Sequence, residues 1–182
     1  PMGTGMLITP HGSELGTLTE GGTGTESANP EQPAGMPERL ESGTQNMPGI
    51  AGLRAGIAFV RRHGPEKIHE YEISLLRTLY SELAAIDGIV LYTQTPDARW
   101  FAPVLSFNVD GMESEEVGKL LGDAGIAVRA GLHCAPEAHR FMGTQKIGAV
   151  RVCPSAFTTR KDIASLTAAL RKILMKNNRI KH

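Results

Sequence analysis

From residue 65 to residue 174, helical and strand-like hydrophobic patterns alternate along the chain. A helical pattern over residues 65–86 places Leu75, Leu76, Leu79 and Leu83 on one face and charged residues on the other. Four short apolar runs follow it, at 89–93, 103–109, 126–129 and 147–152, with further helical patterns at 114–124, 135–141 and 159–174. Alternation at this spacing predicts a small α/β domain, in which a short mixed sheet is flanked by helices.

The first third of the chain differs from the rest in composition. A short buried strand is expected at residues 6–9, and residues 10–46 are then rich in Gly, Pro, Ser, Thr and Glu. Three interpretations of this stretch stay open: a functional loop, a loop that binds another subunit, and disorder. Asn46 can cap a helix that carries Ile50, Leu53, Ile57 and Val60 on one face and that breaks at residues 64–65. These changes predict two parts, residues 1–63 and 64–182.

The bulk composition excludes several classes of function. The formal net charge is zero, which gives no long-range attraction to nucleic acid or to an anionic membrane. No apolar run is long enough to span a bilayer. Two cysteines make a disulfide framework improbable and indicate a reduced, cytoplasmic setting. The first residue is Pro1 rather than Met, so we expect an incomplete chain.

Cys134 is the strongest candidate for chemistry. It lies beside His133 and just before an expected short helix, where unpaired backbone N–H groups favour a thiolate. A nucleophilic or sulfur-carrying thiol and a buried apolar cysteine are equally compatible with the local sequence. His133 is either a proton donor or acceptor or a hydrogen-bonded loop residue. Cys153 follows a strand and precedes a proline, and we expect it to be structural.

Two arginines lie in or at the end of apolar strands. Arg129 ends one run and Arg151 lies inside another, and burying an unpaired guanidinium is costly. Each therefore needs an anion, which is either a structural carboxylate such as Glu137 or Asp110 or the carboxylate of a ligand. Two arginines and a cysteine on neighbouring strand ends favour an amino-acid-like ligand.

Weaker signals concern phosphate and metal binding. Gly43 and Thr44 precede a helix and could hold a phosphate through a backbone N–H and a hydroxyl, although such a turn is common in proteins without this function. The six histidines show no metal-ligand spacing, and His63, His69 and His139 are expected on the surface.

Several motifs, in order, resemble the cysteine desulfurases, a group of class V aminotransferases among the fold-type I pyridoxal-phosphate (PLP) enzymes. The C-terminal motifs are Arg-Ala-Gly-Leu-His-Cys-Ala-Pro at 129–136, Ala-His-Arg at 138–140, Gly-Thr at 143–144, Gly-Ala-Val-Arg at 148–151 and Phe-Thr-Thr at 157–159. Earlier motifs lie at 20–25, 41–46 and 48–53, and the opening residues 1–5 resemble the segment that follows the cofactor lysine. The resemblance covers essentially the whole chain and implies the C-terminal part of such an enzyme.

The resemblance implies a role for each matching residue. Cys134 matches the cysteine that accepts sulfur as a persulfide, and Arg151 and Arg129 match arginines that bind the substrate carboxylate beside His133. Gly43 and Thr44 match a loop that reaches the cofactor phosphate of the other subunit of a homodimer. Residues 1–63 match the end of the large cofactor domain, and residues 64–182 match the small C-terminal domain.

The implied reaction is PLP-dependent removal of sulfur from L-cysteine to give alanine, with a possible sulfur-acceptor protein and a link to iron–sulfur cluster assembly. No lysine lies in a Ser/Thr-x-His-Lys context, so this chain is expected to be inactive alone. Selenocysteine or cysteine sulfinate as substrate remains an alternative, as does a non-enzymatic thiol, sulfur-relay or interaction module.

Overall fold

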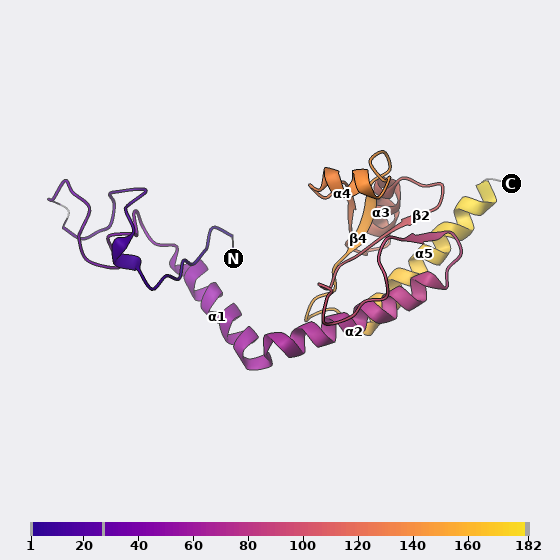
Figure 1. Ribbon diagram of the computed structural model, residues 1–182, viewed down its shortest axis with the longest axis horizontal. Helices are drawn as coiled ribbons and strands as arrows, with labels where there is room; N and C mark the ends of the chain where they lie inside the picture. The colour runs from indigo at the N-terminus through magenta and orange to yellow at the C-terminus, as the bar shows by residue number, and fades with distance from the viewer. Residues whose placement is uncertain (1, 27, 181–182) are drawn as a thin grey trace. The chain divides into compact units, whose positions relative to one another are not determined.

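The computed structural model describes residues 2–26 and 28–180, and these divide into two compact units, 1–62 and 63–182 (Figure 1). Pro1, the first residue of the stretch compared with the cofactor-lysine region, lies outside the described residues. No helix in the described ranges has the length and apolar character needed to cross a membrane.

The first unit has little regular structure before its long helix. A single 3-10 turn, Gly12–Glu14, precedes α1, Met47–His63. The predicted cap of α1 is confirmed, because the Gly49 backbone N–H donates to Asn46 Oδ1 at 3.0 Å. The strand predicted at residues 6–9 is wrong: these residues form no strand, and Leu7 and Ile8 are exposed. A strand needs a neighbour to satisfy its backbone groups, and the described part of this unit offers none.

The second unit has the predicted α/β architecture. Its elements are, in order, α2 Pro65–Ala84, β1 Ile89–Leu91, β2 Leu105–Val109, α3 Ser114–Asp123, β3 Arg129–Gly131, α4 Pro136–Phe141, β4 Ala149–Val152 and α5 Arg160–Ile180. The strands form one sheet in the order β1-β2-β4-β3, and all three pairings are antiparallel, where the sequence predicted a mixed sheet. The third strand begins at Arg129, three residues later than predicted.

The two faces of the sheet carry different kinds of side chain, apolar on one face and polar on the other. Side chains alternate between the faces along each strand, so Phe107 and Val150 face one side while Ser106 and Arg151 face the other. Helices α2, α3 and α5 cover the first face, and there Leu76, Phe107 and Val150 are fully buried. This apolar layer holds the unit together, because burying each large apolar side chain contributes about 1.5–3 kcal/mol. The opposite face is left for polar side chains.

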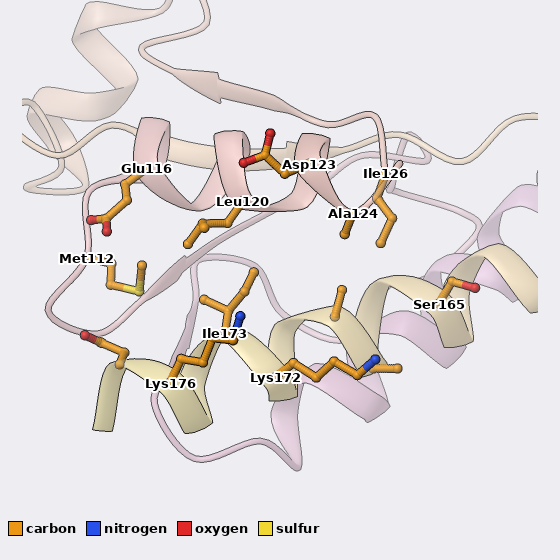
Figure 2. A pocket seen from close by; sticks show the side chains of 13 residues that line it. Met112, Glu116, Leu120, Asp123, Ala124, Ile126, Ser165, Lys172, Ile173 and Lys176 are labelled. Carbon is orange, nitrogen blue, oxygen red and sulfur yellow. The ribbon is translucent and has the colours of Figure 1, made fainter. Parts of the chain in front are cut away.

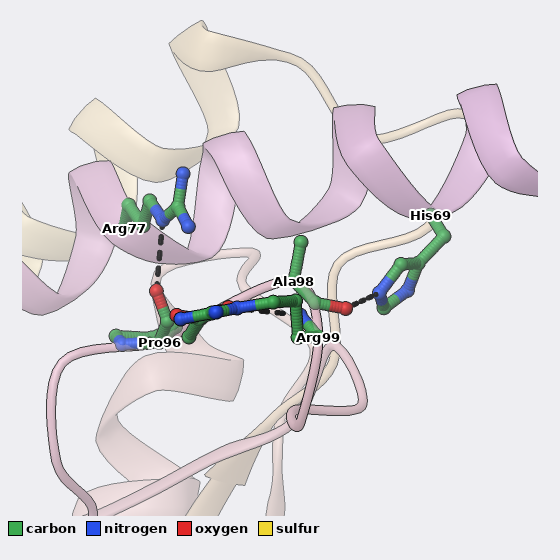
Figure 3. Close-up of polar contacts among 6 residues, drawn as sticks. His69, Arg77, Pro96, Ala98 and Arg99 are labelled. Carbon is green, nitrogen blue, oxygen red and sulfur yellow. Dashed lines mark hydrogen bonds and ion pairs between the residues drawn. The ribbon is translucent and has the colours of Figure 1, made fainter.

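Capping and tethering fix the ends of the helical layer. Thr159 and Asp162 form the predicted reciprocal cap of α5: the Thr159 N–H donates to Asp162 Oδ2 at 2.7 Å, and the Asp162 N–H donates to Thr159 Oγ1 at 3.3 Å. The loop between β1 and β2 is tied to α2 by Arg77 Nε, which donates to Pro96 O at 2.8 Å, and by His69 Nε2, 2.8 Å from Ala98 O (Figure 3). His69 is therefore half-buried rather than a free surface residue as predicted.

A hollow of this unit lies between α3 and α5 (Figure 2). It has a volume of about 730 Å³, and Leu120 of α3 and Ile173 of α5 point into it from opposite sides. It belongs to the helical layer and contains neither a cysteine nor a histidine. The reactive side chains lie instead on the opposite face of the sheet.

Candidate active site

The polar face of the sheet places two arginines directly opposite each other. In the strand register, Arg151 of β4 pairs with Arg129 of β3 on one side and with Ser106 of β2 on the other. Directly opposed residues share a face and lie about 5 Å apart, so their side chains form one row across the sheet. The predicted proximity of the two arginines is therefore a property of the register.

Neither guanidinium has a carboxylate partner. Of the two acids suggested by the sequence, Glu137 pairs with Arg140 at 2.7 Å, and no ion pair joins Arg129 or Arg151 to any acid within the described ranges. Arg151 is half-buried, and its Nε is shielded from solvent without a hydrogen-bond acceptor. Like charges opposed across a sheet destabilise it, and an unsatisfied buried donor costs about 1–3 kcal/mol. Arg151 Nε is thus left available to an anionic ligand.

Cys134 lies in a tight turn that begins where β3 ends. His133 and Cys134 both have left-handed backbone conformations, with φ of 53° and 57°. Non-glycine residues adopt this region rarely and at a cost, so two in succession mark a turn that its surroundings hold in place. The turn exposes the thiol and brings Cys134 Sγ to 3.7 Å from Arg129 Nη2. Cys134 is thus neither buried nor remote from the arginines.

The contacts of the His133 imidazole favour one tautomer of its neutral form. His133 Nε2 lies 2.9 Å from Ala149 O, and because a carbonyl only accepts, Nε2 must donate. Nδ1 is buried without a partner and is therefore left as an acceptor. Burial lowers the pKa of His133 below its usual 6.5, and the neighbouring Arg151 lowers it further, although the hydrogen bond to Ala149 opposes this shift.

His133 and Arg151 line a cavity of about 300 Å³ on this face of the sheet. Thr93 Oγ1, His133 Nδ1 and Arg151 Nε are buried polar atoms without partners, and all three residues line it. Buried polar atoms are nearly always satisfied in folded proteins, so three orphans around one hollow indicate a ligand site. The volume suits a molecule of amino-acid size.

Other residues of this cavity were not singled out by sequence analysis. Tyr92 lines it and accepts a hydrogen bond from Asn108 Nδ2 at 2.9 Å. His139, predicted on the surface, is 7% exposed, and its Nδ1 lies 2.7 Å from Thr144 Oγ1. Tyr92 and Ser106 could have been found from strand alternation, because each occupies a position out of phase with the apolar core residues. His139 and Thr144 lie in the motifs at 138–140 and 143–144, but no spacing in the sequence indicated their burial or their contact.

Gly43 and Thr44, the other predicted site residues, belong to the first unit. Gly43 has φ of 77°, and its N–H already donates to Gly21 O at 2.9 Å. Thr44 is exposed, and its N–H and hydroxyl bond to no group in the described part of the chain. A phosphate would fit Thr44, which offers two free donors, while Gly43 supplies the backbone conformation that presents them.

Cys153 and the possible metal ligands form no comparable site among the described residues. Cys153 is a free, exposed thiol rather than the structural cysteine predicted. No group of three or more His, Cys, Asp or Glu residues in the described ranges could hold a metal ion.

The chain matches the family model described as aminotransferase class-V over residues 1–166. A probable cysteine desulfurase of Xylella fastidiosa (strain 9a5c) is 36% identical over 137 residues, which are 75% of this chain and 32% of the relative. A probable cysteine desulfurase of Methanothermobacter thermautotrophicus is 32% identical over 179 residues, 95% of this chain and 44% of the relative. The apo structure of cysteine desulfurase from Thermococcus onnurineus NA1 has a TM-score of 0.68 and 29% identity, covering 77% of this chain and 34% of its own. The chain thus spans about a third of the first relative's length.

Proposed function

Because the chain belongs to the aminotransferase class-V family, we propose that it is the C-terminal part of a PLP-dependent cysteine desulfurase, which removes sulfur from L-cysteine as a persulfide and leaves alanine. One observation carries the proposal: Arg129, which lies opposite the half-buried Arg151 in the sheet, brings its Nη2 to 3.7 Å from the exposed thiol of Cys134. The identity to two probable cysteine desulfurases, 36% and 32%, supports it.

The arginine pair binds the substrate carboxylate. Arg151 presents a desolvated donor, and Arg129 lies opposite it, so one carboxylate between them would neutralise the repulsion and satisfy Arg151 Nε. Guanidinium groups form parallel hydrogen bonds to a carboxylate, which fixes the orientation of the amino acid as well as its position. The substrate's thiol is then directed toward the turn that carries Cys134.

Cys134 accepts the sulfur. Its thiolate attacks the substrate's sulfur, an S–S bond forms, the substrate's C–S bond breaks, and the electron pair of that bond passes to the carbon, which is later protonated to give alanine. Arg129 Nη2, 3.7 Å from the Cys134 sulfur, stabilises negative charge there. His133 Nδ1, the unpaired acceptor in the same cavity, takes a proton released during the transfer.

PLP, when bound, supplies the electron sink that makes cleavage of the C–S bond possible. In this proposal, residues 1–63 are the end of the large cofactor domain, and Thr44 reaches the cofactor phosphate of the second subunit of a homodimer. Gly43 supports Thr44 through its left-handed backbone. Since no lysine of this chain lies in a Ser/Thr-x-His-Lys context, we propose that the chain does not bind the cofactor covalently by itself.

The persulfide must be handed to a sulfur-acceptor protein. The exposure of Cys134 on a protruding turn supports this step, because an acceptor thiol has to reach the terminal sulfur. The two free thiols fit a reducing, cytoplasmic setting. Iron–sulfur cluster assembly is one use of the sulfur that the proposal accommodates.

The test is sulfide and alanine release from L-cysteine by the complete polypeptide, in the parent and in the Cys134→Ala and Cys153→Ala variants. We expect Cys134→Ala to lose at least about a hundredfold in turnover, as the loss of a nucleophile does. Cys153→Ala is the matched control and should retain the parent rate. Equal sulfide release by Cys134→Ala and the parent would rule out the persulfide step.

A further inference from the structure

The ring of His139 lies beside the ring of His133, in the turn that carries Cys134. The function proposed above assigns no role to His139. It lies on α4, the short helix that follows Cys134, and its ring centroid is 5.8 Å from that of His133 at a tilt of 39°. It is 93% buried, since only 7% of its surface is exposed. A buried imidazole needs a polar partner, and Thr144 Oγ1 at 2.7 Å provides it.

Thr144 is itself anchored to the sheet. It is 4% exposed, its N–H donates to His139 O at 2.8 Å, and its carbonyl accepts from the Gly148 N–H at 2.8 Å. Gly148 directly precedes β4, which carries Arg151. The pair of His139 and Thr144 therefore connects α4 to the strand whose Ala149 carbonyl holds His133.

Two contacts bear on the position of His133: a hydrogen bond to Ala149 O and a ring contact with His139. Its hydrogen bond to Ala149 O fixes one ring nitrogen, but rotation about the side-chain bonds could present either nitrogen to that carbonyl. The ring of His139 lies beside that of His133, with 5.8 Å between the ring centroids, and both rings line the same cavity. Packing by a neighbour that is itself hydrogen-bonded is what restricts a side chain to one rotamer.

We propose that His139, held by Thr144, is a positioning residue that keeps the His133 imidazole in its Nε2–H tautomer with Nδ1 free in the cavity beside Cys134. The proposal deepens the cysteine desulfurase function. Only the role of Nδ1 as a proton acceptor rests on that function, whereas the positioning of the ring does not. The charged or titratable groups around His133 are Arg129 on β3, Arg151 on β4, His139 on α4 and the Cys134 thiol. Tyr92, at the end of β1, lines the same cavity.

The experiment uses the 182-residue chain in a Cys153→Ser background, so that Cys134 is the single thiol. Thr144→Val removes the hydroxyl while keeping the shape of the side chain, and Thr144→Ser keeps the hydroxyl. His139→Phe keeps a ring without nitrogen, and His139→Asn keeps a polar atom where Nδ1 stands. Circular dichroism and thermal unfolding select the variants that fold, and the His139 variants give an independent test if Thr144→Val does not fold.

Two measurements follow. Long-range ¹H–¹⁵N spectra report the tautomer and titration of His133, whose signals are assigned by their loss in His133→Gln. We expect one Nε2–H tautomer in the parent and in Thr144→Ser. In Thr144→Val and in both His139 variants, each of which loses either the ring contact or the hydrogen bond, we expect mixed tautomers and a titration midpoint moved upward, toward the 6.5 of an ordinary imidazole. The rate of Cys134 alkylation by iodoacetamide between pH 6 and 9 should change its pH profile in the same three variants and not in Thr144→Ser.

The outcomes separate this proposal from the proposed function. A parent that shows the Nδ1–H tautomer overturns it, and so does a folded Thr144→Val chain with the parent's tautomer and titration. If the complete polypeptide released no sulfide from cysteine while Thr144→Val still altered His133, the positioning would stand and the assigned reaction would fall. The tautomer, titration and alkylation measurements are made without cofactor.

Discussion

Replacing Arg151 by methionine should stabilise the small unit while removing its proposed carboxylate site. Arg151 has a buried Nε without an acceptor and a like charge directly opposite, at Arg129. Relief of the unsatisfied donor contributes about 1–3 kcal/mol, and loss of the opposed charge a few tenths more. Methionine keeps the apolar stem, so little packing is lost. We expect a net gain of about 1–2 kcal/mol, which raises the midpoint of thermal unfolding by roughly 3–10 °C for a unit of this size.

The assay is urea unfolding followed by circular dichroism, with Arg171→Met as the matched control. Arg171 is exposed on α5, and its replacement should change the free energy of unfolding by less than about 0.5 kcal/mol. Added acetate should stabilise the parent but not Arg151→Met, because a ligand stabilises only the state that binds it. A loss of more than about 1 kcal/mol in Arg151→Met would refute the reasoning, since the guanidinium would then be satisfied within the unit.

Two further predictions concern the loop tied to α2 and the turn before β4. The Arg99 guanidinium and N–H hold the pKa of Asp97 at about 2, below the usual 3.8, so the contribution of Asp97 to stability is complete above about pH 4 and is lost as the pH falls through 2. The fluorescence of Trp100, the single tryptophan, should show this acid transition in the parent but not in Asp97→Asn, and an unchanged transition in that variant would contradict the assignment. Gly148→Ala should destabilise the unit by about 1–3 kcal/mol more than Gly125→Ala in urea unfolding, because both glycines have positive φ but only at Gly148 would a Cβ lie 2.8 Å from the backbone of β3. Equal losses in the two variants would show that backbone conformation alone matters.

Elements with strong local signals were predictable from the sequence. The Asn46 cap, the break at Gly64 and the reciprocal cap of Thr159 and Asp162 each depend on a few neighbouring residues, and all three are present. The apolar runs also identified the four strands. Their boundaries were less predictable, because residues 126–128 are apolar for packing against the core and not for pairing in the sheet.

Features that depend on distant parts of the chain were not predictable. The burial of His139 requires Thr144 and the cavity beneath the turn, and no spacing in the sequence expresses that contact. Leu7 and Ile8 are exposed because an apolar strand pattern forms a strand only where a neighbouring strand is available to pair with it. The closeness of Arg129 and Arg151 was anticipated from neighbouring strand ends, but their direct opposition required the register.

That register makes the length of β4 more critical than its composition. Each residue of the strand serves either the apolar layer or the polar face according to whether its number is even or odd, so Val150 and Val152 tolerate exchange for other apolar residues. Deleting or inserting one residue before Arg151 would instead turn the guanidinium into the core and a valine toward Arg129. The side chains of the strand are therefore more tolerant of exchange than the count of residues between Gly148 and Arg151.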